Sequence, residues 1–280
     1  SDVYKRQQIR ESDSTGPSRC MKSPADMGAR RIGIVLSGGG ARGIAHLGVL
    51  KALKEFGVKL SMISGTSAGA VAGALFASGM EPEAVLDRIR AGRLIRNLRP
   101  SWQTSGLFSL DVLQRLVAET IPDDNFSSLS MPLTVAATNL GTGTTRYFSE
   151  GRLTLPLMAS CCIPVVFSPV VIDGERYVDG GVLNNLPVEP LVGKCDFIIG
   201  SHCNPVSGTF SGKTMKSVAE RSFLLGVGFN TRASRGHCNV FIEPPALDRF
   251  SAADFTSARD IFDAGYRHTL NNYRPEDFKP

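Results

Sequence analysis

Apolar and polar positions divide the first third of the chain into short segments of two kinds. Residues 32–36 are almost wholly apolar and rich in β-branched side chains, which is typical of a parallel strand covered on both faces. Over 45–56, apolar residues recur at the spacing of one helix face, with Lys and Glu on the opposite side. A second strand is predicted at 60–64, and the small apolar residues 70–77 predict a buried helix.

The remainder of the chain continues this alternation. Strands are predicted at 133–138 and 197–201, and residues 170–178 predict a hairpin that turns at Asp173-Gly174. Further helices are predicted at 82–92, 110–120, 153–161, 214–230 and 257–270. Strands that alternate with helices predict an α/β fold, with a mostly parallel sheet and helices on both of its faces.

Composition bears on the domain organisation. The 280 residues are 42% hydrophobic and 20% charged, which is typical of a globular protein. Residues 1–31 mix Ser, Pro, Asp and Arg without periodicity, so we predict a disordered or non-native leader there and one domain over 32–280. The longest weakly interrupted apolar stretch, 68–77, is far shorter than the about 20 residues of a membrane span. With no apolar signal core in the leader, we expect a cytoplasmic protein.

Charge and cysteine content exclude several other classes. The net charge is +5, but residues 1–31 hold seven Lys and Arg against four Asp and Glu, so no broad basic face for nucleic acid is expected. Six cysteines without a C-x-x-C motif predict reduced thiols. The alternative of a zinc site would use side chains whose spacing matches no structural zinc pattern. These are Cys195, His202, Cys203, His237 and Cys238. We expect neither a metal nor a cofactor.

One G-x-S-x-G motif lies between a predicted strand and a predicted helix. It comprises Gly65, Thr66, Ser67, Ala68 and Gly69. A serine on a tight strand-to-helix turn projects its hydroxyl into open space, and the flanking glycines avoid collisions with neighbouring backbone. The positive end of the following helix lies beside any negative charge that develops there. The motif therefore predicts Ser67 as a nucleophile.

A glycine-rich loop follows the first predicted strand. It comprises Gly38, Gly39, Gly40, Ala41, Arg42 and Gly43. Successive N–H groups at such a place bind an anion, which could be an oxyanion or a phosphate. The loop also matches G-x-G-x-x-G, but the acidic residue that a dinucleotide requires about 20 positions on is missing. A dinucleotide-dependent enzyme is the weaker alternative.

The general base has several candidates. His46 falls at the edge of an apolar helix face, where a buried structural histidine is expected. His202 and His237 follow the serine in the chain order of an α/β-hydrolase triad. Asp179 ends a predicted strand and is followed by two glycines, which is a usual position for a functional residue. The residues alone leave these alternatives open.

Four motifs occur together in a definite order. They are the glycine loop 38–43, the elbow 65–69, the turn Ala159-Ser160-Cys161-Cys162-Ile163-Pro164, and Asp179-Gly180-Gly181. In this order they resemble the patatin-like phospholipase family, specifically its compact bacterial members. The resemblance covers nearly the whole chain beyond the leader.

This resemblance implies a three-layer α/β/α sandwich and a Ser-Asp dyad. Ser67 is then the nucleophile and Asp179 the base, and the N–H groups of the loop 38–43 form the oxyanion hole, with Arg42 fixing the loop. Support comes from Gly65, Gly69, Gly180 and Gly181. The turn 159–164 shapes the site. The implied substrates are fatty-acyl esters of phospholipids, lysophospholipids or acylglycerols, cleaved through an acyl-enzyme without a metal.

One further stretch bears on partners. Five arginines without an intervening acid are interleaved with Ile and Leu; they are Arg88, Arg90, Arg93, Arg96 and Arg99. Such a stretch suits peripheral contact with an anionic membrane, while a solvated helix face is the simpler interpretation. The following segment, 97–110, is a candidate mobile cover. A catalytically idle lipid-binding or regulatory module is a further alternative, and the oligomeric state is not predicted.

Overall fold

The computed structural model describes residues 30–91, 110–206, 212 and 214–279, and residues 31–280 form one compact unit. Its centre is an eight-stranded sheet in the order β5-β6-β3-β2-β1-β7-β8, with β4 also paired to β3. The strands are β1 (Ile32–Leu36), β2 (Leu60–Thr66), β3 (Leu133–Asn139), β4 (Thr144–Phe148), β5 (Val170–Ile172), β6 (Glu175–Asp179), β7 (Phe197–Ser201) and β8 (Val240–Ile242). From β8 to β3 the pairing is parallel, whereas β4, β5 and β6 pair antiparallel.

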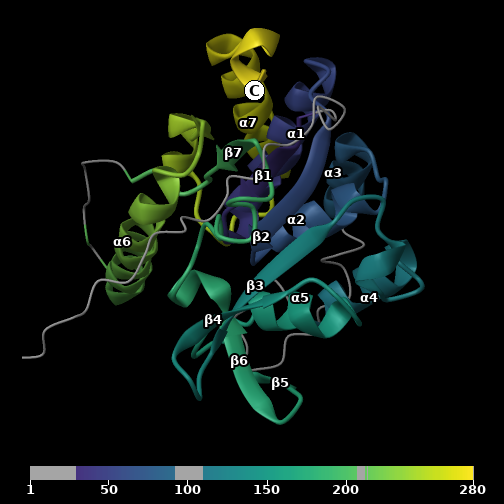
Figure 1. The fold of residues 1–280 in the computed structure, drawn as a ribbon. Helices are drawn as coiled ribbons and strands as arrows, with labels where there is room; N and C mark the ends of the chain where they lie inside the picture. The colour runs from purple at the N-terminus through teal and green to yellow at the C-terminus, as the bar shows by residue number, and fades with distance from the viewer. Residues whose placement is uncertain (1–29, 92–109, 207–211, 213, 280) are drawn as a thin grey trace, which may run out of the picture. The chain divides into compact units, whose positions relative to one another are not determined.

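Helices cover the sheet unequally (Figure 1). They are α1 (Ile44–Glu55), α2 (Ala68–Ala77), α3 (Pro82–Arg90), α4 (Leu110–Thr120), α5 (Thr154–Ser160), α6 (Met215–Arg235) and α7 (Ala258–Asn272). All but α6 contribute to the main core, which includes Ile34 and Ile63 of the sheet. The opposite face, with Val35 and Ile198, packs against Leu186 and Leu191 from the connection before β7. The fold is therefore mixed α/β around a central sheet, as predicted.

The predicted elements match closely where the pattern is strong. The strands at 32–36 and 197–201 have the predicted bounds, and the hairpin turns at Asp173 and Gly174 with φ of 53° and 81°. The sequence analysis missed β4 and β8. Strand β4 begins Thr-Thr-Arg and has no fully buried residue, and β8 is three residues long, so neither gives a recognisable apolar pattern.

The pairing of β3 brings two distant segments together. Ala136 pairs with Thr66 at the end of β2, and the next residue, Ala137, pairs with Asp179 at the end of β6. Strands β2 and β6 therefore lie one after the other along the same side of β3. Strand β6 begins to pair where the chain leaves β2 and enters α2. Because β6 runs antiparallel, its last residue lies beside the residue that follows β2.

Some expectations fall on parts of the chain that are not described. The leader up to residue 29, the cover 97–109, and Arg93, Arg96 and Arg99 lie outside the described residues. Arg88, near the end of α3, donates to the Thr120 hydroxyl at 3.3 Å. Within the described part of the chain, no helix has the length and apolar character that a membrane crossing requires.

Candidate active site

The turn from β2 into α2 holds Ser67 in an unusual conformation. Its φ is 52° and its ψ is −125°, a combination that side-chain-bearing residues rarely adopt. Its N–H donates to the Ser160 hydroxyl at 2.7 Å, and this hydroxyl donates to the Ala136 carbonyl at 2.6 Å. A Cβ at Gly69 would collide with the backbone at the end of β1, so α2 approaches that strand closely. The strained turn is thus fixed from two sides.

Asp179 is held through three polar contacts. Its N–H donates to the Cys162 carbonyl at 2.8 Å, and its carbonyl accepts from the Thr138 hydroxyl at 3.0 Å. The carboxyl accepts from the Gly181 N–H at 2.7 Å. The side chain is only 4% exposed, and burial raises its pKa to about 6, while hydrogen bonds from Gly181 and the Ser67 hydroxyl oppose this rise. The fold therefore places the Ser67 hydroxyl beside this carboxyl.

Side chains from later in the sequence fasten the glycine loop. The Gly38 carbonyl accepts from the Asn204 amide at 2.6 Å, and the Gly38 N–H donates to the Asn185 carbonyl at 3.2 Å. The buried Arg42 guanidinium donates through Nε to the Phe250 carbonyl at 2.6 Å. The loop is therefore tied to three other segments of the chain.

Not all N–H groups of this loop are available to a ligand. The Ala41 N–H donates to the Ala252 carbonyl at 2.7 Å, whereas the N–H groups of Gly39 and Gly40 have no acceptor among the described residues. Gly40 has a φ of 58°, and a Cβ there would collide with the Ala252 carbonyl. The available donors are therefore those of Gly39 and Gly40, which lie at the start of the 3-10 helix Gly40–Gly43.

The remaining glycines of the predicted site are all close-approach positions. A Cβ at Gly65 would come within 2.7 Å of the Ala70 nitrogen, and one at Gly43 would collide with the Ala68 side chain. A Cβ at Gly180 would come within 2.5 Å of the Ala136 carbonyl oxygen, and one at Gly181 would lie 3.0 Å from the Asp179 carboxyl. Gly65 and Gly180 let backbone approach backbone, and Gly43 and Gly181 leave room for neighbouring side chains.

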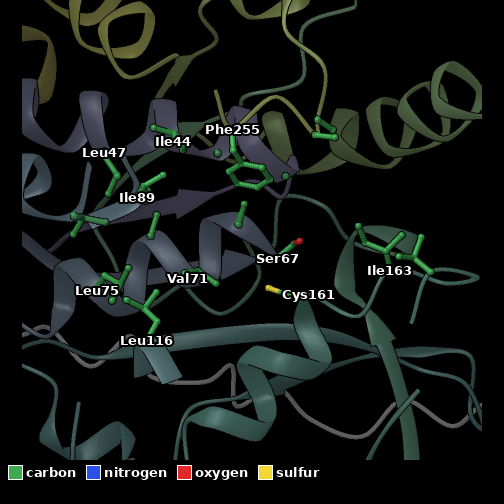
Figure 2. Close-up of a pocket in the computed structure, with 18 of the residues that line it drawn as sticks. Ile44, Leu47, Ser67, Val71, Leu75, Ile89, Leu116, Cys161, Ile163 and Phe255 are labelled. Atoms are coloured by element: carbon green, nitrogen blue, oxygen red, sulfur yellow. The ribbon is translucent and has the colours of Figure 1, made fainter. Parts of the chain in front are cut away.

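An apolar cavity of about 240 Å³ opens at Ser67 (Figure 2). Ser67, Val71 and Leu75 form one row along α2 at a spacing of four residues, and this row lines one wall. Other walls come from Ile44, Leu47, Ile89, Leu116, Ile163 and Phe255. Besides Ser67, the Cys161 thiol is the only side chain with a polar hydrogen among the described residues of the lining. The described lining therefore offers one hydroxyl in an otherwise apolar chamber.

Sequence reasoning missed the residues that position others. Ser160 and Cys161 belong to the turn 159–164, which was expected only to shape the site. The Cys161 thiol lies beside the Ser67 hydroxyl, and burial raises its pKa well above the usual range (Figure 2). Asn204 gave no motif signal. Its position just beyond the end of a parallel strand, where functional residues gather in α/β sheets, was the available clue.

The histidines lie elsewhere. His46 is fully buried and hydrogen-bonded through both ring nitrogens, and burial lowers its pKa to about 4. His202 is bonded through Nδ1 to Glu243 at 2.6 Å, and His237 is exposed. No histidine among the described residues lines the cavity at Ser67. The residues weighed as zinc ligands form no group of three or more that could hold a metal within the described part of the chain.

Comparisons with known proteins place this geometry in context. The model of the family described as patatin-like phospholipase matches residues 34–192, more than half of the chain. An NTE family protein of Mycobacterium tuberculosis is 34% identical over 180 residues, 62% of this chain and 50% of that protein. The lysophospholipase NTE1 of Kluyveromyces lactis is 26% identical over 275 residues, 86% of this chain and 19% of that protein. The chain thus spans half or less of the length of these relatives.

Solved structures were also compared. VipD from Legionella pneumophila has a TM-score of 0.49 and 16% identity, covering 86% of this chain and 66% of that chain. Human GIVD cytosolic phospholipase A2 has a TM-score of 0.48 and 12% identity, covering 89% of this chain and 59% of that chain.

Proposed function

Because the chain belongs to the patatin-like phospholipase family, we propose that it is a serine acyl hydrolase that cleaves fatty-acyl esters of phospholipids, lysophospholipids or acylglycerols. One observation supports the proposal: Ser67 lines an apolar cavity, and its hydroxyl acts on the pKa of the buried Asp179 carboxyl as a neighbouring donor would. A hydroxyl needs an adjacent base to become a nucleophile, and an apolar chamber suits a hydrocarbon chain.

The reaction proceeds in two halves. Ser67 Oγ attacks the ester carbonyl carbon while Asp179 takes its proton, and the Gly39 and Gly40 N–H groups bind the negative oxygen of the tetrahedral intermediate. The C–O bond to the alcohol then breaks, and Asp179 returns the proton to the leaving oxygen. Water then attacks the carbonyl carbon of the acyl-enzyme while Asp179 takes its proton. The bond between the acyl group and Ser67 Oγ breaks, which releases the fatty acid, and Asp179 returns the proton to the Ser67 oxygen. One donor of the oxyanion hole is worth about 3–4 kcal/mol.

The apolar cavity has the lining and length to bind the hydrocarbon chain of the acyl group. The row from Ser67 to Leu75 extends about 12 Å along α2, at 1.5 Å per residue. A hydrocarbon chain attached at Ser67 would lie along Val71 and Leu75 and leave water. Each buried methylene then contributes about 0.8 kcal/mol to binding. The substrate class is therefore an ester with an apolar acyl chain rather than a small polar ester.

A histidine triad has less support than the dyad. His202 and Glu243 bond to each other beside a different cavity, and His237 lies exposed at the end of α6. Neither ring lines the cavity at Ser67, so neither is placed to take the proton from its hydroxyl.

The proposal is tested with a fluorophosphonate probe and a panel of lipid esters. We expect the probe to label Ser67, identified by the mass of its peptide, because fluorophosphonates react with activated serines. We also expect fatty acid to be released from at least one ester among a lysophospholipid, a phospholipid and a diacylglycerol. Labelling at another residue, or equal fatty-acid release by a Ser67→Ala variant, would contradict the proposal. Absence of both labelling and release would favour an idle module.

A further inference from the structure

A second cavity of about 270 Å³ lies between α6 and the ends of β7 and β8. Its volume far exceeds the about 30 Å³ that one water molecule occupies in the liquid. His202 and Asn204 line its inner part, and Arg232 and Arg235 line it from the last turns of α6. The proposed hydrolytic reaction uses none of these four side chains chemically.

Two residues that line this cavity each have a buried polar atom without a partner within the described chain. Asn204 is 2% exposed; its amide nitrogen donates to the Gly38 carbonyl, so its Oδ1 is the free atom, and it is an acceptor. His202 is 4% exposed; its Nδ1 bonds the Glu243 carboxylate and therefore carries the proton. In the neutral ring, Nε2 is then a second unpartnered acceptor. An orphaned buried acceptor costs about 1–3 kcal/mol, so a ligand with hydroxyl donors fits here.

The charges at the cavity favour an anion. Arg232 and Arg235 form no salt bridge with a carboxylate among the described residues. Arg235 lies over the Phe241 ring at 4.5 Å, and that ring stacks on His202. The opposing charge is Glu243, which His202 already engages. Two arginines against one glutamate leave one positive charge, which matches the single negative charge of a phosphodiester.

The outer edge of the same cavity is apolar. Leu225 and Phe229 of α6 line it and are 52% and 71% exposed. Large exposed apolar side chains beside arginines are typical of a helix that contacts a lipid surface.

From these contacts we propose that this cavity binds a polyol phosphodiester, the chemistry of the head group of an anionic phospholipid. The phosphate lies at Arg232 and Arg235, and the hydroxyls donate to Asn204 Oδ1 and His202 Nε2. The site is separate from the cavity at Ser67, and its occupation does not depend on hydrolysis.

Binding is tested on the Ser67→Ala protein, so that no turnover occurs. Glycerophosphoglycerol is titrated by calorimetry, and we expect binding at one site. A double variant, Arg232→Gln with Arg235→Gln, is expected to lower the affinity at least about tenfold, because two charge-assisted hydrogen bonds are lost. The matched control is Arg146→Gln with Arg176→Gln, two exposed arginines on β4 and β6. Thermal unfolding of each variant checks that it remains folded.

A second arm identifies the source of the ligand. If the ligand is a bilayer lipid, the Ser67→Ala protein floats with phosphatidylglycerol vesicles and not with phosphatidylcholine vesicles, and Leu225→Ser with Phe229→Ser reduces flotation. Titration without flotation supports the site and assigns a soluble ligand. The proposal is wrong if glycerophosphoglycerol does not bind at millimolar concentration, or if both arginine pairs lower its affinity equally.

Discussion

Asp179→Asn is expected to lower kcat/KM for a soluble ester about a thousandfold or more and, in the same protein, to raise the free energy of unfolding above neutral pH. The loss of activity follows because an amide cannot accept the proton of the Ser67 hydroxyl. The amide oxygen can still accept the Gly181 N–H, so the turn after β6 is retained. Activity is measured with a short-chain p-nitrophenyl ester and stability with urea.

The gain in stability follows from the raised pKa. Burial holds the pKa of Asp179 at about 6, whereas a carboxyl in the unfolded chain has a pKa of about 3.9. The folded protein therefore binds this proton more tightly than the unfolded chain does. The contribution of this proton to the free energy of unfolding is complete below about pH 4 and is lost as the pH rises through about 6. Above that, the buried charge costs about 3 kcal/mol, which the neutral amide avoids. The difference in the free energy of unfolding between Asp179→Asn and the parent should vanish near pH 4.

The same pKa predicts the pH profile of the parent enzyme. Because the carboxylate is the active base, kcat/KM should fall about tenfold per pH unit below about pH 6. His237→Ala is the matched control, since this exposed side chain lies outside the site, and its activity should equal that of the parent. Full activity in Asp179→Asn would refute the dyad.

Ser67→Ala is expected to abolish ester turnover, with a fall of about ten-thousandfold or more in kcat. Ser67→Gly should do the same but should be more stable than Ser67→Ala by about 1 kcal/mol. The reason is that φ of 52° suits glycine and strains any residue with a Cβ. The two variants therefore separate the chemistry of the hydroxyl from the conformational cost of the turn.

Their stabilities are compared by urea unfolding at one pH, and their residual activity by fatty-acid release. If the alanine and glycine variants are equally stable, the turn at Ser67 is not strained in solution. If either retains turnover, another nucleophile is at work. The Ser67→Ala protein also serves as the non-hydrolysing background for ligand binding.

Much of the fold could be predicted because its pattern is local. Strand 32–36 is apolar at nearly every position and is buried on both faces, and the turn at Asp173-Gly174 has the residues that left-handed conformations favour. Ser67 could be singled out because the G-x-S-x-G motif lies at a predicted strand end. The partnership with Asp179 came from resemblance to a family, since residue patterns alone left two histidines as rivals.

What could not be predicted depends on the pairing of distant strands. The carboxyl reaches Ser67 because β2 and β6 are consecutive neighbours of β3, and no local pattern specifies that register. The same is true of Asn204, which is 166 positions from the Gly38 carbonyl that it holds. Polar residues of this kind are not distinguished by spacing, because their partners are set by the sheet order.

The packing of the glycines has a consequence for how relatives of this chain are interpreted. At Gly40, Gly69 and Gly180 an added methyl group would run into backbone, whether or not any ester is cleaved nearby. A descendant that had given up catalysis could exchange its serine freely but would still be obliged to retain these glycines in order to fold. Glycine signatures therefore record ancestry and architecture, and under the proposed mechanism only the hydroxyl and the carboxylate together distinguish a working enzyme from a silent one.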